Sequence, residues 1–487
     1  MKKILFFLLF VISFVFAHDE CITVKHVTTD NGFDDNIIIL AFNKAKSDNK
    51  PCVKLTGGNW KIKNFIVVPT GMELRGTYTA QHGYTKAGST VECFGEQLVP
   101  DQFNGKQGCI MLQGGSAVDG LNVVWPYGRY ADASWSPFNP YVFNGIEHNY
   151  PWSISCISSS TLDGLDYPGK CTIRNVTISN AKFGIDLDFG FDHHLENVNI
   201  GTYGYGILLD NIASLGIMEN IRISDEYIWE YYNKSSLNYN KAQIPGFVNE
   251  GLYNWVIGIK LNRVDWGDLR NIYVRKAYKG FVFDINPGVT YEVPFPQDPP
   301  DMWWQNPQVY FNTIVCDSCN YAIDALSIQK PAGIQIVNGN LMGKINVEYS
   351  NWGPIHISNT ILDYATPTLN ENLPHIYNKS SNCEISLSNT IIRTGGNAST
   401  GASFNHVIIQ NYGRMSLSNV NMIQLNPSIP YSAVFQHVIT ADADKYHKSS
   451  FLWWDGLYST ANLVYSQIDH NGSPVTGRLL IQNVNHE

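Results

Sequence analysis

Apolar and polar residues alternate in two short phrases that recur along the middle of the chain. The first phrase begins with asparagine, and its copies start at Asn175, Asn197, Asn220, Asn271 and, more weakly, Asn312. The second phrase begins with glycine or alanine, and its copies start at Gly184, Gly206, Gly258, Gly280 and Ala322. Alternation with a period of two predicts a β-strand in each phrase.

The phrases recur at a nearly constant spacing. Asn175 and Asn197 are 22 residues apart, and Asn220 follows 23 residues later. Two or three short strands in each repeat of this length form one coil of a solenoid. A single coil cannot bury its apolar face, so the coils must stack into a continuous core. The pattern therefore predicts an all-β fold, a right-handed single-stranded parallel β-helix.

The first 17 residues have a different pattern. Two lysines precede an apolar run from Ile4 to Phe16, and small residues stand before the end of the segment at Ala17. This pattern is typical of a secretory signal peptide and is too short for a membrane span. No other stretch reaches the length needed to cross a bilayer, so we expect a secreted, extracellular protein without a membrane-bound part.

The composition of the chain restricts the kinds of ligand that we expect it to bind. Charged residues make up 15 % of the chain and the net charge is −9, so no basic patch for nucleic acid is expected. Nine cysteines in an exported chain favour disulfides over metal ligation. Short loops suggest the bridges Cys93–Cys109 and Cys156–Cys171, and Cys21–Cys52 closes the N-terminal cap. We interpret Cys316 and Cys319 as a tight structural bridge, with a redox pair or half a zinc site as the alternatives, and Cys383 is left as a free thiol. Glycosylation sequons begin at Asn175, Asn233, Asn378, Asn397 and Asn471.

The segment after the signal peptide carries a set of short motifs. Asp34 and Asp35 precede a stretch of helix-forming residues up to Asp48, followed by Gly58 and Trp60 and then by Leu74-Arg75-Gly76. These residues resemble the opening of the pectate-lyase-like β-helix proteins, in particular the rhamnogalacturonase/epimerase-like branch. The resemblance implies a pectin-lyase-like solenoid with an N-terminal capping helix, and a carbohydrate as ligand. We interpret Asp34 as the N-cap of that helix rather than as a catalytic residue.

Three long insertions interrupt the coils, at residues 125–152, 225–255 and 286–310. We expect the β-helix to span residues 18–440, with an N-terminal cap at about 18–76, and a C-terminal cap at 441–487. All three insertions are rich in Trp and Tyr. Aromatic faces over a groove hold the apolar faces of sugar rings. The candidate substrate-binding aromatics are Trp229, Trp255, Trp303 and Trp304.

Acidic residues occupy the outward positions of the second phrase. When the coils stack, outward-facing residues at equivalent positions form columns, and Asp186 belongs to one of them. In the neighbouring column Asp188 lies beside Asp210, about 4.8 Å apart. Two carboxylates this close cannot both ionise freely, so one is expected to act as a general acid. The other remains a base or nucleophile, as glycoside hydrolysis requires. A solvated ladder of acids and a calcium site are the two alternatives.

Basic residues near these acids add further candidates. His193 and His194 follow the acidic strand and could orient a carboxylate or serve in acid–base catalysis. Lys260 and Arg263 could bind a uronate or act as the base of a lyase, and a structural salt bridge between Lys260 and Asp284 is the alternative. Asp284 itself continues the second outward column.

The chain lacks the motifs of its better-known relatives. The polygalacturonase signatures Asn-Thr-Asp, Gly-His-Gly and Arg-Ile-Lys do not occur, and its only Asp-Asp lies in the N-terminal cap. We therefore predict a secreted enzyme that cleaves an extracellular polysaccharide, by hydrolysis through paired carboxylates and without a cofactor. A polysaccharide lyase or C5-epimerase, and a non-catalytic carbohydrate-binding or adhesion protein, are the alternatives. The oligomeric state stays open.

Overall fold

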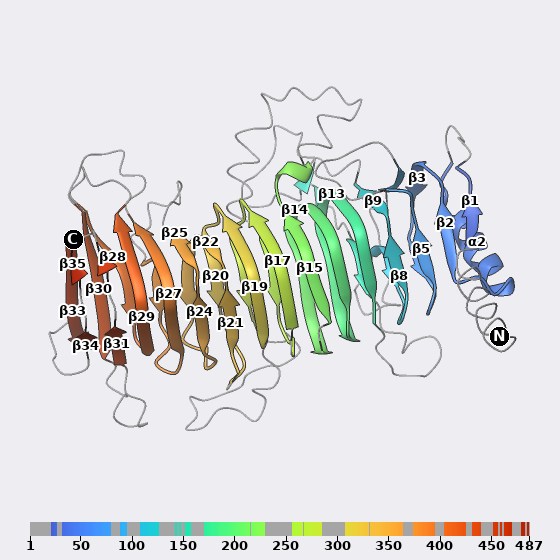
Figure 1. Cartoon of the computed structure of the whole chain (residues 1–487). Coiled ribbons are helices and arrows are strands. Elements are labelled where there is room, and N and C mark those ends of the chain that lie inside the picture. Colours follow the sequence, from blue (N-terminus) through green and yellow to red (C-terminus); the bar gives the residue numbers. More distant parts are fainter. Residues whose placement is uncertain are drawn as a thin grey trace, which may run out of the picture.

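The computed structural model describes most of the solenoid. The described residues are 21–26, 32–78, 88–94, 108–125, 142–143, 146–147, 151–156, 170–214, 216–228, 256–265, 267–284, 307–330, 332–363, 374–394, 404–424, 431–439, 451–455, 458–459, 462–469, 479–482 and 485–486. They form a right-handed parallel β-helix in which successive coils stack along one axis (Figure 1). A helix stands at the N-terminal end of the stack. The predicted fold class is confirmed.

Each coil contributes strands to three parallel sheets, here named the first, second and third sheet in their order along the chain. Two long strands, β13 (Thr172–Phe191) and β14 (His194–Ser214), run through all three sheets in turn. Their residues 172–174 and 194–196 pair in the first sheet, and 176–178 and 198–200 in the second. Residues 183–188 and 205–210 pair in the third sheet.

The remaining strands take their places beside these two. The first sheet also contains β1 (Ile22–Val24), β2 (Cys52–Leu55), β5 (Glu73–Arg75), β8 (Ala117–Asp119), β21 (Ile334–Val337), β24 (Ile355–Ser358), β31 (Phe451–Asp455) and β34 (Leu479–Gln482). The second contains β3 (Gly58–Ile62), β6 (Ser89–Cys93), β9 (Leu121–Val124), β22 (Asn340–Met342), β25 (Ile361–Asp363), β32 (Tyr458–Ser459) and β35 (Asn485–His486).

Five strands bend from the first sheet into the second: β15 (Ile217–Ile223), β17 (Gly267–Arg275), β19 (Val309–Asp317), β27 (Glu384–Thr394) and β29 (Arg414–Gln424). The third sheet contains β4 (Ile66–Val68), β7 (Gly108–Leu112), β12 (Trp152–Cys156), β16 (Ile257–Leu261), β18 (Lys279–Phe283), β20 (Tyr321–Ala325), β23 (Lys344–Val347), β26 (Ile376–Asn378), β28 (Phe404–Asn411), β30 (Tyr431–Ile439) and β33 (Asn462–Asp469). A separate antiparallel pair, β10 (Val142–Phe143) and β11 (Ile146–Glu147), lies inside the first insertion.

The core consists of aligned aliphatic columns. In the third sheet, Ile154 pairs with Ile185, which pairs with Ile207 and then Ile259, and all four side chains are fully buried. Each such side chain contributes about 1.5–3 kcal/mol when it leaves water. The parallel pairing also continues past residue 440, since β31 pairs with β29 and β33 with β30. The coils therefore extend into the segment that we expected to be a separate C-terminal cap.

The N-terminal helix α2 (Asp35–Ser47) matches the predicted helix to within one residue. Asp34 occupies the N-cap position, yet its side chain makes no capping hydrogen bond to α2. Instead its Oδ2 accepts a hydrogen bond from the backbone N–H of Lys61, at 2.7 Å. Asp34 therefore stands at the N-cap position as expected, but the capping role expected for its carboxylate is wrong, because the carboxylate binds the backbone of strand β3 instead.

All four predicted disulfides are present: Cys21–Cys52, Cys93–Cys109, Cys156–Cys171 and Cys316–Cys319. Cys383 is the free cysteine and is fully buried. Among the residues that the structure describes, no helix has both the length and the apolar character needed to span a membrane.

Candidate functional site on the third sheet

The predicted acidic columns lie on the third sheet in the expected register. Asp186 pairs with Leu208, and the same column continues through Lys260 and Val282 to Asp324. In the neighbouring column, Asp188 pairs with Asp210. Backbone hydrogen bonds from Asn262 N to Leu209 O (2.9 Å) and from Asp284 N to Leu261 O (2.8 Å) extend that column. The structure therefore brings Asp188, Asp210 and Asp284 into line.

The burial of these acids differs from that of a solvated ladder. Asp186 is 1 % exposed and Asp210 is 4 % exposed. Both alternate with core residues such as Ile185 and Leu209, so their side chains point away from the core on the outer face of the sheet. Since they are nevertheless covered, the solvated-ladder interpretation is wrong for these two residues. The side chain of Asp188 lies outside the described residues.

Acid–base pairs occupy the next coils of the same face. Lys260 Nζ lies 3.0 Å from Asp284 Oδ2, which is the structural salt bridge we considered as the alternative for this lysine. Lys279 forms an ion pair with Asp324. One corner further, Arg263 lies 3.4 Å from Asp265, and burial raises the pKa of the Asp265 carboxyl. Each of these cations is therefore held by a neighbouring carboxylate.

The two candidate histidines lie in different environments. His193 is fully buried, and its Nδ1 accepts a hydrogen bond from the backbone N–H of Cys171 at 3.2 Å. Burial lowers the pKa of His193 to about 4, which keeps the ring neutral at physiological pH. His194 lies in the first sheet, with Nε2 3.6 Å from Glu196. Among the described contacts, neither ring touches Asp186 or Asp210.

One grouping of possible metal ligands occurs among the described side chains: Cys156, Cys171 and His193, with ligand atoms within 4.8 Å of one another. Both cysteines belong to one disulfide, so neither offers a thiolate. The described acids of the third sheet do not form a group of three ligands. The described side chains therefore provide no calcium site there.

A half-buried aromatic ladder borders the acids, and our sequence reasoning missed it. Trp152, Phe183 and Tyr205 lie in register on adjacent coils of the third sheet. Ring centroids are 5.0 Å apart for Trp152–Phe183 and 5.9 Å apart for Phe183–Tyr205, with the rings tilted by 33° and 39°. The signal was present in the sequence, because Phe183 and Tyr205 each directly precede the glycine of the second phrase. The four candidate tryptophans, Trp229, Trp255, Trp303 and Trp304, lie outside the described residues.

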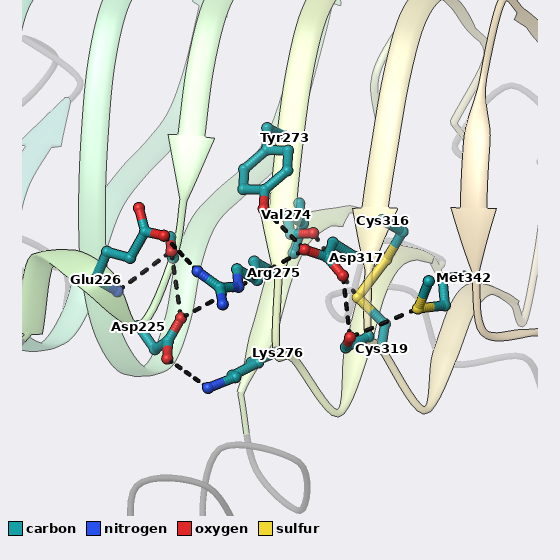
Figure 2. Close-up of polar contacts among 12 residues, drawn as sticks. Asp225, Glu226, Tyr273, Val274, Arg275, Lys276, Cys316, Asp317, Cys319 and Met342 are labelled. Carbon is teal, nitrogen blue, oxygen red and sulfur yellow. Dashed lines mark hydrogen bonds and ion pairs between the residues drawn. A yellow bond between two sulfur atoms is a disulfide. The ribbon is translucent and has the colours of Figure 1, made fainter. Parts of the chain in front are cut away.

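A charged network holds the base of the second insertion against the second sheet (Figure 2). Arg275, at the end of β17, contacts Asp225, Glu226 and Asp317, and Lys276 Nζ lies 2.9 Å from Asp225 Oδ2. The Tyr273 hydroxyl donates to Asp317 at 3.0 Å. Because Asp225 and Glu226 are the first residues of the insertion, the network anchors the point at which that loop leaves the coil.

No protein-family model matches this chain, and no curated protein matches it. Solved structures with a related arrangement of strands do match. The catalytic unit of a GH87 α-1,3-glucanase from Streptomyces thermodiastaticus is 12 % identical, with a TM-score of 0.41, over 96 % of this chain and 69 % of that one. The A-module of the Azotobacter vinelandii mannuronan C-5 epimerase AlgE4 is 8 % identical (TM-score 0.34; 95 % and 92 %). The Streptococcus pneumoniae surface protein and adhesin PfbA is 9 % identical (TM-score 0.39; 95 % and 100 %).

Proposed function

We propose that the protein binds an extracellular polysaccharide across the third sheet and hydrolyses it through the aligned carboxylates. The observation that supports this proposal most is the stacked ladder of Trp152, Phe183 and Tyr205, whose rings are half buried. Apolar faces of sugar rings pack on such rings. Asp186 lies three residues after Phe183 on the same strand, which corresponds to about 10 Å at 3.3 Å per residue.

The proposal places a pair of carboxylates beside this ladder, as glycoside hydrolysis requires. Asp188 and Asp210 occupy paired positions on adjacent strands, about 4.8 Å apart along the stack. We assign one of them the role of general acid and the other that of base or nucleophile, a division that requires two unlike environments. Asp186, in the neighbouring column, is proposed to orient the sugar.

A binding protein without hydrolytic activity is the second candidate. The observation that favours it is the low exposure of Asp186 and Asp210, at 1 % and 4 %, because a hydrolase must bring its substrate to these carboxylates. A lyase or C5-epimerase has less support. The residues proposed as its base or carboxylate ligand, Lys260 and Arg263, are each held by an acid in the structure.

Export remains part of the proposal. Four disulfides fit an oxidising compartment, and the N-terminal segment 1–17 has the pattern of a signal peptide. Glycosylation at two of the sequons conflicts with the fold. Asn175 donates its side-chain amide to Asp119 at 2.8 Å, and Asn378 is fully buried with its amide donated to Asn411.

Incubation of the purified protein with α-1,3-glucan, alginate and polygalacturonate separates the three functions. New reducing ends without ultraviolet absorbance from unsaturated products support hydrolysis. That absorbance indicates a lyase, and retention of a polysaccharide without products indicates a binding protein. If none of the polysaccharides is bound or cleaved, the proposed function is wrong for this panel of glycans.

Substitutions then test the assigned residues. Asp188→Asn or Asp210→Asn should lower turnover by about two orders of magnitude or more, the usual effect of losing a general acid or base. Phe183→Ala should weaken binding, because it removes the central ring of the ladder. Matched controls on the first sheet are Glu219→Gln and Tyr310→Ala, which should change neither quantity. Wild-type turnover in both Asp variants would exclude this pair.

A further inference from the structure

A second group of aromatic side chains lies several coils further along the third sheet. Tyr349 is 63 % exposed. Tyr377 and Tyr412 are half buried, with ring centroids 6.3 Å apart and planes inclined by 44°. Burial raises the pKa of both phenols, that of Tyr412 to about 12, so both rings are neutral at physiological pH.

Tyr377 and Tyr412 occupy the same outward columns as the acids, and Tyr349 directly follows Glu348, a member of one of these columns. Tyr377 pairs with Asn346, which pairs with Asp324 in the column of Asp186. The neighbouring column runs through Glu348 and Lys379 to Tyr412, with backbone hydrogen bonds from Lys379 N to Val347 O and from Tyr412 N to Asn378 O, both at 2.9 Å. The tyrosines are therefore continuous with the face that carries the aromatic ladder.

Polar groups with balanced charge border the tyrosines. Lys379 Nζ lies 2.6 Å from Glu348 Oε1 and 5.1 Å from the centre of the Tyr377 ring. Asn346 Nδ2 donates to the same Glu348 Oε1, at 3.0 Å. Rings flanked by hydrogen-bonding groups whose charges are already paired suit a sugar unit, whose apolar face stacks while its hydroxyls find polar partners.

The distance between the two aromatic groups sets the length of the ligand. Five successive pairings separate β14, which carries Tyr205, from β26, which carries Tyr377. At about 4.8 Å for each pairing, the two groups are about 24 Å apart along the axis of the solenoid. A short oligosaccharide cannot reach both groups, whereas a polymer lying along the face contacts both.

We propose that Tyr349, Tyr377 and Tyr412 form a second carbohydrate-binding subsite, which holds a remote segment of the same polysaccharide chain. The inference rests on the proposed function at the aromatic ladder. It extends the binding site from the ladder along the axis of the solenoid. Two linked contacts raise the affinity for a polymer above that of either contact alone, because the second contact forms within the complex. The protein is therefore selective for long chains over short oligosaccharides.

The test compares a polymer with its own tetrasaccharide. The probe is the polysaccharide of the α-1,3-glucan, alginate and polygalacturonate panel that the wild-type protein retains. The variant Tyr349→Ala/Tyr377→Ala should bind the polymer about tenfold or more weakly, with the affinity for the tetrasaccharide at the ladder unchanged. Tyr349→Phe/Tyr377→Phe, which keeps both rings, should bind the polymer like the wild type. Tyr310→Ala on the first sheet is the matched control for loss of an exposed ring.

The outcomes separate this inference from the function on which it rests. Unchanged binding of the polymer by the Ala variant overturns the subsite but leaves the ladder in place. Equal loss of polymer and tetrasaccharide also overturns it, because the tyrosines would then act through the ladder or through the fold. If the wild type binds none of the three polysaccharides, both proposals fail together. A single Tyr349→Ser variant repeats the test at the most exposed position, where the substitution disturbs packing least.

Discussion

Asparagine recurs at the corner between the first and second sheets for two physical reasons. Asn175, Asn197, Asn220 and Asn271 adopt positive φ angles of 52–57°, which asparagine tolerates better than most residues. Their side-chain amides also link the coils, as Asn197 Nδ2 does to Asn175 Oδ1 at 3.2 Å. At the next coil Thr313 takes this position, with φ 63°, and not Asn312 as the repeated phrase suggested. The pairing of β17 with β19 places Thr313 opposite Asn271, so the repeated phrase in the sequence was aligned one residue too early at this coil.

At the same scale, His193 should make stability depend on pH. Burial lowers its pKa from 6.5 to about 4, so the unfolded chain binds this proton more readily than the folded one. The contribution of neutral His193 to the free energy of unfolding is therefore complete above about pH 6.5. It is lost as the pH falls towards 4, by up to about 3 kcal/mol. Denaturant unfolding at pH 7, 5.5 and 4 measures this loss.

The variant His193→Asn isolates the effect. The asparagine Oδ1 can accept the Cys171 N–H bond but does not titrate, so the acid loss should shrink. His194→Asn, at a partly exposed site, should leave the loss unchanged. A pH profile that is identical in the wild type and in His193→Asn would show that other groups cause the dependence.

At the scale of single elements, α2 is attached to the solenoid by its two leading acids. Asp34 binds the N–H of Lys61, and Asp35 accepts hydrogen bonds from the N–H groups of Lys63 (3.0 Å) and Asn64 (2.9 Å). Both acids are buried. The helix, its place and the Asp pair were predictable from the sequence. The partners were not, because those donors lie 27–29 residues away and are brought near only when β3 forms.

Loss of the Asp35 clamp should destabilise the N-terminal end. Asp35→Ala leaves two N–H groups of a part-buried turn without their acceptor, at a cost of about 1–3 kcal/mol. Hydrogen exchange should rise in α2 and β3 and remain unchanged in the third sheet. Asp48→Ala at the exposed far end of the helix is the control. Uniform loss of protection along the whole solenoid would contradict a local clamp.

At the scale of the molecule, the coils form one continuous stack from β1 to β35 (Figure 1). The four bridges lie between residues 21 and 319, whereas the C-terminal coils are described without one. Cys383 lies in that C-terminal part, where burial raises the pKa of its thiol. Its reactivity therefore reports on the opening of coils that no described disulfide holds.

The expected labelling follows from this arrangement. Under native conditions Cys383 should resist alkylation, and in denaturant without reductant it should be the single cysteine labelled, with four bridges intact by peptide mapping. Labelling during a denaturant titration should follow the C-terminal coils. Rapid labelling of Cys383 in the native protein, or a second labelled cysteine, would contradict the buried thiol or the pairing.

Local patterns in the chain were sufficient for the repeat, the parallel β-helix, the capping helix and the disulfide pairs. They were sufficient because strand periodicity and short loop closures are properties of neighbouring residues. The pairing of Asp188 with Asp210 also followed, since one residue of register fixes a whole column.

Burial and cross-coil partners depended on the folded chain. Asp186 and Asp210 lie in the outward columns predicted from the sequence, but only the folded chain showed that they are covered and that Lys260 is paired with Asp284. Neighbouring rings in the aromatic ladder and in the tyrosine group are 22 to 35 positions apart in the sequence: Trp152, Phe183 and Tyr205 in the first, Tyr377 and Tyr412 in the second. Stacking makes such distant residues neighbours, and no local pattern encodes which side chains then cover one another.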